Sequence, residues 1–265
     1  MKSLIRWSAV LGLVSSTFLA SSLTPTMRAL ALSEQQIMEK LRPVPVFTIT
    51  DAQGSPLIAN VPNEGKQTPV AGVFISMQDA EAFINELKKN NPQLAQQVKV
   101  VPVSLAEVYK MDQDNKSKAE QLAFAYVPMK QQVDSALALL RQQGQQISEF
   151  NGVPMFIATG GADKGYLTIK QGNEQVIPVF FNKEDLQGLI TRFGQQQPEL
   201  LNQVEIKVVD LQGIIETMQK SNDPQLNQLV LIPPRDSINF IRSLMPAGQP
   251  PAQLPAGQQP PATPR

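Results

Sequence analysis

The sequence contains no cysteine and no histidine. Without cysteine the chain cannot form a disulfide, a thiol nucleophile or a thiolate metal site. Without histidine it lacks the partner of a serine nucleophile and the usual general base near neutral pH. Carboxylate or lysine chemistry stays open, so an enzyme is not excluded by these absences. They favour a non-catalytic protein that needs neither a metal nor another cofactor.

Long apolar runs are also scarce, and the one substantial run lies at the N-terminus. Residues 1–31 combine the positive charges of Lys2 and Arg6, an apolar stretch broken by serines, and an A-x-A site at Ala29–Ala31. This pattern predicts a secretory signal peptide. The alternative is an uncleaved anchor helix, which is disfavoured because the run is shorter than the roughly 20 residues that a membrane span needs.

The charge balance offers no surface for nucleic acid. The chain has 23 basic and 23 acidic residues, and removal of the predicted signal would take away Lys2, Arg6 and Arg28 but no acid. The remaining chain is mildly acidic, whereas proteins that neutralise phosphates carry basic patches. An exported chain without cysteine is also independent of the redox state outside the cytosol.

The C-terminal residues 246–265 are rich in proline, glutamine, alanine and glycine. Such a composition buries too little apolar surface to offset the entropy of ordering, so the sequence predicts a disordered tail. The alternative is a proline-rich ligand for another protein. It has less support because no P-x-x-P pair in the segment has basic residues on both sides.

Between the signal and the tail the sequence repeats itself. The stretch "GVFISMQDAEAFINEL" from Gly72 matches "PVFFNKEDLQGLITRF" from Pro178, and "PVFTITDAQGSPLI" from Pro45 matches "PMFIATGGADKGYLTI" from Pro154. The apolar stripes of the helices keep the same phase in both copies, which is typical of a duplication. We therefore expect two repeat halves, 32–144 and 145–245. A pseudo-twofold axis would relate them, and the short polar linker favours their packing as one domain.

Each half is expected to be α/β, more closely a mixed α+β unit in which amphipathic helices cover a mixed sheet. The elements predicted for the first half are strands at 44–50 and 56–59 joined as a hairpin by the turn 51–54, a strand at 71–76, a helix at 77–90, a strand at 98–105, a short helix from 106, a strand at 122–128, and a helix at 130–144 closed by Gly144.

The strand-to-helix turn at Ser76 resembles turns that hold a phosphate or a nucleophile in enzymes. As N-cap, the Ser76 hydroxyl can accept from the backbone N–H of Asp79, and Asn182 can do the same with Asp185 in the second half. A cap tolerates this exchange of Ser for Asn, whereas a nucleophile does not. The acids in the first turn would also repel an anion. The sequence therefore predicts a structural cap at both positions.

Two other segments resemble ligand loops only in composition. The glycine-rich residues 159–165 lack the Lys-Ser/Thr pair of a P-loop, and we expect a hairpin loop. The stretch "DQDNKSKAE" from Asp112 is rich in oxygen ligands but lacks the glycine and the glutamate of a calcium loop. We expect a solvated loop there.

Four stretches carry a resemblance to a known family: "VPVFTITDAQGSPL", "GVFISMQDAEAFINEL", "VKVVPVSLAEVY" and "PVFFNKEDLQGLITRF". They resemble the family of the twenty-two-kilodalton component of the chloroplast inner-envelope protein translocon, and the bacterial-type signal makes the chain similar to its cyanobacterial homologues. The resemblance implies a pseudo-symmetric α/β fold with apolar surface pockets. It implies no catalytic residues.

The resemblance also implies a chaperone-like role in protein transport or import. The protein would bind unfolded precursor proteins between two membranes and support outer-membrane biogenesis, with the outer-membrane assembly machinery as a further partner. It would reside in the periplasm, peripheral to membranes at most. The thylakoid lumen is the alternative compartment, and plastid relatives would occupy the intermembrane space. A non-catalytic structural adaptor between membrane complexes, and a hydrolase or transferase that uses carboxylates, are the competing functions.

The expected client surface is the second helix of each half, where apolar stripes lie on short helices that are only partly covered. The alternative is that both stripes are ordinary core. The seven residues of this predicted surface are Leu105, Val108, Tyr109, Leu211, Ile214, Ile215 and Met218.

Overall fold

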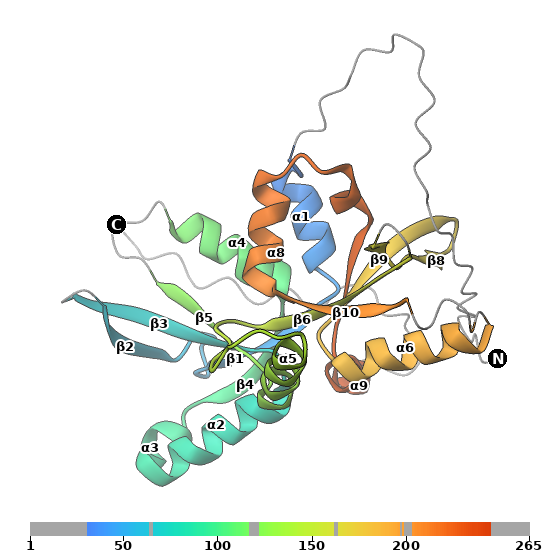
Figure 1. The fold of residues 1–265 in the computed structure, drawn as a ribbon. Coiled ribbons are helices and arrows are strands. Elements are labelled where there is room, and N and C mark those ends of the chain that lie inside the picture. Colours follow the sequence, from blue (N-terminus) through green and yellow to red (C-terminus); the bar gives the residue numbers. More distant parts are fainter. Residues whose placement is uncertain are drawn as a thin grey trace. The chain divides into compact units, whose positions relative to one another are not determined.

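The computed structural model describes residues 31–63, 66–116, 122–161, 164–196, 198 and 203–244. The predicted tail and all of the predicted signal segment except Ala31 lie outside these residues. The chain forms two compact units, each built around its own sheet (Figure 1). Of the described residues, unit 1 combines 31–37 with those of Ser135–Ser148 and Pro154–Ile232, and unit 2 combines those of Met38–Asp134 and Glu149–Val153 with 233–244.

The sheet of unit 2 has the order β2-β3-β1-β4, and β5 pairs with β3. The β3–β5 pair is parallel and the other pairs are antiparallel. The strands are β1 (Pro45–Thr50), β2 (Ile58–Asn63), β3 (Lys66–Phe74), β4 (Lys99–Ser104) and β5 (Ala123–Val127).

The sheet of unit 1 repeats this plan with the order β10-β6-β9-β11, and the β9–β11 pair is again parallel. Two equivalent sheets, each covered by helices, confirm the mixed α+β class and the repeated architecture. The strands are β6 (Pro154–Gly160), β7 (Gly165–Tyr166), β8 (Ile169–Gln171), β9 (Glu174–Phe180), β10 (Glu205–Asp210) and β11 (Leu229–Ile232).

The turn after β1 forms as predicted, but the hairpin that it starts is short. Thr50 pairs with Pro56, and the N–H of Leu57 donates to the carbonyl of Ile49 at 2.7 Å. The chain then leaves β1 and runs along β3 as β2. The predicted strands at 56–59 and 71–76 are therefore wrong in extent. The sequence misses this pairing because β2 is exposed and shows no alternation of apolar and polar residues.

In the second repeat, the described part of the glycine-rich segment matches the predicted hairpin, and residues 162–163 lie outside the described residues. β6 and β7 pair antiparallel on its two sides, with Thr159 opposite Tyr166. Gly161 has φ +76° and Lys164 has φ +49°, as expected for a tight turn.

The predicted helices form, and α2 has the predicted bounds, while α1, α3 and η1 are additional to the prediction. The helices are α1 (Glu34–Leu41), α2 (Met77–Asn90), α3 (Pro92–Ala95), α4 (Leu105–Asn115), α5 (Lys130–Gln142), α6 (Lys183–Gln196), α8 (Leu211–Lys220), α9 (Arg235–Leu244) and the 3-10 helix η1 (Pro224–Gln228). Gly144, with φ +85°, follows α5 as expected.

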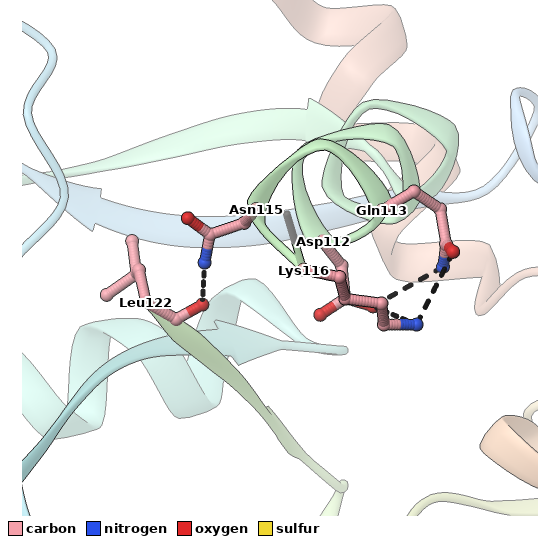
Figure 2. A network of polar contacts seen from close by, with 5 residues as sticks. All are labelled: Asp112, Gln113, Asn115, Lys116 and Leu122. Carbon is pink, nitrogen blue, oxygen red and sulfur yellow. Dashed lines mark hydrogen bonds and ion pairs between the residues drawn. The ribbon is translucent and has the colours of Figure 1, made fainter. Parts of the chain in front are cut away.

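The oxygen-rich segment from Asp112 is not a loop throughout, because its first four residues form the last turn of α4. Figure 2 shows how this turn is held: Lys116 Nζ lies 3.3 Å from Asp112 Oδ2, and the buried Asn115 donates to the carbonyl of Leu122. The helix continues beyond the prediction because its polar side chains bond to one another and because Asn115 ties its end to the start of β5. Residues 117–120 of the predicted loop lie outside the described residues.

The last helix of each repeat belongs to the unit of the other repeat. α9 lies in unit 2, where the Phe240 and Phe47 rings meet edge to face with centroids 5.7 Å apart. The buried Ser237 hydroxyl of α9 donates to the Ile75 carbonyl at 3.3 Å. Conversely, α5 from Ser135 onward is grouped with unit 1. The predicted boundaries 32–144 and 145–245, and the packing of the halves as one domain, stay predictions.

The two predicted caps differ. Ser76 Oγ accepts from the Asp79 N–H at 3.4 Å, so the first cap is confirmed. The prediction for Asn182 is wrong, because its Oδ1 is buried and has no hydrogen-bond partner. A buried acceptor without a partner is a cost, whereas a cap stabilises.

The caps give a matched pair of substitutions. Replacing Ser76 with alanine is expected to lower the free energy of unfolding by about 1 kcal/mol, because it removes a bonded cap. Asn182→Ala is expected to cost less than half of that, because it removes an acceptor that makes no bond. Urea unfolding followed by circular dichroism measures both, and equal losses would contradict the difference between the two caps.

The carboxyl group of Asp79 is expected to make the free energy of unfolding depend on pH. Burial raises the pKa of its carboxyl above the ordinary value of 3.8, and the Ser76 hydrogen bond lowers it by less. The folded chain thus holds this proton more tightly than the unfolded chain, so this group's contribution to stability falls as the pH rises through its folded pKa. Asp79→Asn is expected to reduce the fall of the unfolding free energy as the pH rises from the ordinary carboxyl pKa through the raised pKa of the folded chain. An unchanged slope would contradict this.

The aromatic contact of Phe240 tests how much the packing of α9 stabilises unit 2. Phe240→Ala is expected to lower the unfolding free energy by about 2 kcal/mol, below the range for fully buried phenylalanines because Phe240 is half-buried. Phe83→Ala is the matched control: the Phe83 ring also contacts a ring of unit 2, that of Phe74, at a tilted angle, but Phe83 is 45% exposed. Chemical denaturation measures both variants, and an equal or larger loss for Phe83→Ala would show that α9 packing contributes little.

Candidate functional site

Unit 1 contains an apolar cavity of about 380 Å³. The sheet contributes one wall, and α8 and the segment around η1 contribute the others. Its apolar lining includes Ile157, Ile177, Val179, Val209, Ile214 and Leu226.

Helix α8 places Ile214 beside the cavity. Its N-cap is Asp210, whose Oδ2 accepts from the N–H of Gly213 at 2.9 Å. The helix buries Leu211, Ile215 and Met218, which follow a spacing of four and three residues on one side. Ile214 lies next to this stripe and is half-buried, because it lines the cavity instead of the packed core.

The segment after α8 closes the other side. Asp223 caps η1 by accepting from the Gln225 N–H at 2.9 Å, and Pro224 occupies the first turn, where its missing N–H costs nothing. This short helix brings the buried Leu226 to the cavity.

Three of the polar side chains that line the cavity bond locally, and Tyr166 and Gln225 also lie on its wall. Asp210 and Asp223 cap their own helices, and the Thr217 hydroxyl donates to the Gly213 carbonyl at 2.7 Å. The cavity therefore offers mainly apolar contact, without a set of polar groups converging on one point. Such a surface suits apolar side chains of varied shape better than one oriented small molecule.

The titratable groups show no catalytic arrangement in the part of the chain that the structure describes. No cluster of three or more acidic residues is placed there to hold a metal ion. The most strongly shifted group is Tyr126: burial, and secondarily the Asp112 carboxylate, raises the pKa of its hydroxyl far above the usual range. A phenol that keeps its proton is a poor base and a poor nucleophile.

The structure places the seven predicted client residues on α4 and α8. Leu105, Val108 and Tyr109 are buried on α4 of unit 2. On α8, only Ile214 lines the cavity, and the other three are buried. The two groups belong to different units, and their role in client binding stays a prediction.

The sequence did not predict that Tyr166 and Leu226 contribute to the wall of the cavity. Tyr166 of β7 lines the cavity and is 46% exposed, but it stands in a hairpin with no regular pattern. Leu226 had a usable signal, since Asp223 followed by Pro224 is a typical helix start.

Among the described residues, no helix combines the length and the apolar character that a membrane crossing requires.

The chain is similar to chloroplast proteins of plants. It is 29% identical over 207 residues to the TIC 22-like chloroplastic protein of Arabidopsis thaliana, a match that covers 77% of this chain and 62% of that protein. The chain thus spans less than two thirds of the length of this relative. It is 26% identical to the chloroplastic protein TIC 22 of Pisum sativum over 207 residues, covering 78% of this chain and 75% of that protein.

Two solved structures share the fold. Anabaena Tic22, described as a protein-transport protein, is 39% identical with a TM-score of 0.73, and the match covers 83% of this chain and 100% of that one. Tic22 from Plasmodium falciparum superposes with a TM-score of 0.60 over 78% of this chain and 96% of that one. At 23% identity this second likeness is one of fold alone.

The Tic22-like family matches residues 6–243, which is nearly the whole chain outside its C-terminal tail. This match confirms the resemblance inferred from the four sequence stretches. The family is not a family of enzymes, in line with the absence of cysteine and histidine. The chain therefore belongs to the Tic22-like family.

Proposed function

We propose that this chain is a protein-transport factor of the chaperone type, which binds unfolded precursor proteins between two membranes. The observation that carries this proposal is the apolar cavity of unit 1, whose acidic residues Asp210 and Asp223 are both used as helix caps. The description of the Anabaena neighbour as a protein-transport protein supports it.

The size and chemistry of the cavity fit such a client. Its volume of about 380 Å³ falls within the roughly 300–1,000 Å³ range of ligand sites. A precursor that has not folded exposes apolar side chains, and each gains free energy when it leaves water for an apolar wall. Because its lining is mainly apolar, the cavity would accept clients with different sequences.

The proposed compartment is the periplasm, and the proposed clients are precursors of outer-membrane proteins. The signal-like residues 1–31 support export. The outer-membrane assembly machinery is the proposed acceptor of these clients. The thylakoid lumen remains the alternative compartment.

Ile214 tests the cavity. Ile214→Ser is expected to weaken suppression of aggregation of an unfolded outer-membrane β-barrel precursor by about fivefold, because it makes the cavity wall polar and removes apolar area worth about 1 kcal/mol. The assay is light scattering during dilution of the precursor from urea, at increasing concentrations of the chain.

Met111→Ser is the matched control. Met111 is 43% exposed on α4, so this substitution removes apolar area of similar size outside the cavity. Suppression by Met111→Ser is expected to equal that of the wild type. Equal activity of the two variants would reject the cavity as the client site, and an inactive wild type would favour the structural adaptor.

A further inference from the structure

Among the residues that the structure describes, no strand pairs with the outer edge of β2. β2 pairs with β3 on one side and stands at the end of the strand order. With β3 it forms a two-stranded arm that extends past β1 and β5, because β1 pairs with β3 only at Val73 and Phe74 and β5 only from Val70 (Figure 1). An edge strand of this kind presents unpaired backbone N–H and C=O groups.

Two prolines assign which backbone groups face the open side. Asn60 lies opposite Pro69, and Pro62 lies opposite Gln67. A proline nitrogen has no hydrogen, so in an antiparallel ladder it belongs at a position whose nitrogen points away from the partner strand. Residue pairs along an antiparallel ladder alternate between hydrogen-bonded and non-hydrogen-bonded pairs, so two pairs that lie two residues apart are of the same kind. The prolines therefore identify both of these pairs as non-hydrogen-bonded. The free edge therefore offers the N–H and carbonyl of Ile58, those of Asn60, and the carbonyl of Pro62.

The edge also lacks the usual protection against pairing. Residues 58–62 carry no charge and are all exposed, and the apolar Ile58 and Val61 are 48% and 45% exposed. The equivalent edge strand of unit 1, β8, has only three residues, with the exposed Lys170 at its centre. Short strands and lysine are common protections of sheet edges. One copy of the repeat is therefore protected and the other is open.

We infer that the free edge of β2 binds an extended, uncharged segment of a client polypeptide as an added strand. This inference rests on the proposed function and names a second mode of client recognition. A backbone ladder recognises the extended state and not the sequence, and the exposed Ile58 and Val61 add apolar contacts on the two faces of the strand.

A second copy of this chain fits the edge less well. In a symmetric antiparallel pair centred on Asn60, each Ile58 would face Pro62 of the other copy. The Ile58 carbonyl would then meet a nitrogen that has no hydrogen to donate. An unrelated extended segment supplies an N–H at that point, so it satisfies every outward group of the edge.

Asn60→Pro tests the inference with the full chain. It removes the central outward N–H and leaves the β2–β3 hydrogen bonds intact, whereas Asn60→Thr changes the same side chain and keeps the N–H. The probe is a fluorescent peptide of about eight alternating valine and threonine residues, and binding is measured by fluorescence anisotropy. Asn60→Pro is expected to weaken binding about tenfold, and Asn60→Thr less than twofold.

Two further measurements test whether the peptide pairs with the outer edge of β2. The bound peptide is expected to slow hydrogen exchange of the Asn60 amide. Val61→Pro is expected to destabilise the arm, because its N–H bonds to β3, while Asn60→Pro keeps the wild-type thermal midpoint. Peptide binding by Asn60→Pro at wild-type affinity would overturn the inference. So would a wild-type dimer that Asn60→Pro dissociates, since the occupant would then be a second copy.

The precursor aggregation assay separates this inference from the proposed function. If Asn60→Pro suppresses aggregation as well as the wild type while Ile214→Ser does not, the strand edge is rejected and the cavity stands. If the wild type suppresses no aggregation and binds no peptide, both are rejected. Weaker suppression by both variants supports two modes of recognition on one chain.

Discussion

The burial of β1 along its whole length is the constraint on which unit 2 depends. A strand buried on both faces needs a cover on each side of its sheet. The face that carries Phe47 and Ile49 packs against α2, through Ala80, and against α9, through Phe240. This face of the sheet is therefore covered both by α2, which is close to β1 in the sequence, and by α9, which comes from the far end of the chain. This contact joins the first strand and the last helix of the fold, so unit 2 is complete only when α9 is in place.

The duplication produced equivalent units with different surfaces. β6 is buried like β1, and the strand order of the second sheet repeats that of the first. The elements around these equivalent strands differ between the two units. α8 together with η1 leaves a cavity in unit 1, and β2 is a long uncharged edge where β8 is short and carries Lys170. The shared core preserves the fold, and the differences between the copies are where recognition can be built.

The sequence predicted the elements whose apolar pattern reflects burial. The bounds of α2, the cap at Ser76 and the repeated plan follow from local spacing alone. It did not predict the course of β2 along β3, because an exposed strand has no buried face to leave a pattern. Nor did it predict the transfer of α9 to unit 2, because an apolar stripe does not say which sheet it covers. For the site, it indicated α8 and Ile214, but the wall at Leu226 depends on tertiary packing.

The central claim is that an unfolded precursor places apolar side chains in the cavity of unit 1. Photo-crosslinking tests it most directly, with a photoreactive amino acid introduced at Ile214 of the chain and, separately, at Met111. An unfolded outer-membrane precursor is then added. The account predicts an adduct from position 214 that disappears when the precursor has folded, and little or none from position 111. Equal adducts from the two positions, or none from position 214, would contradict it.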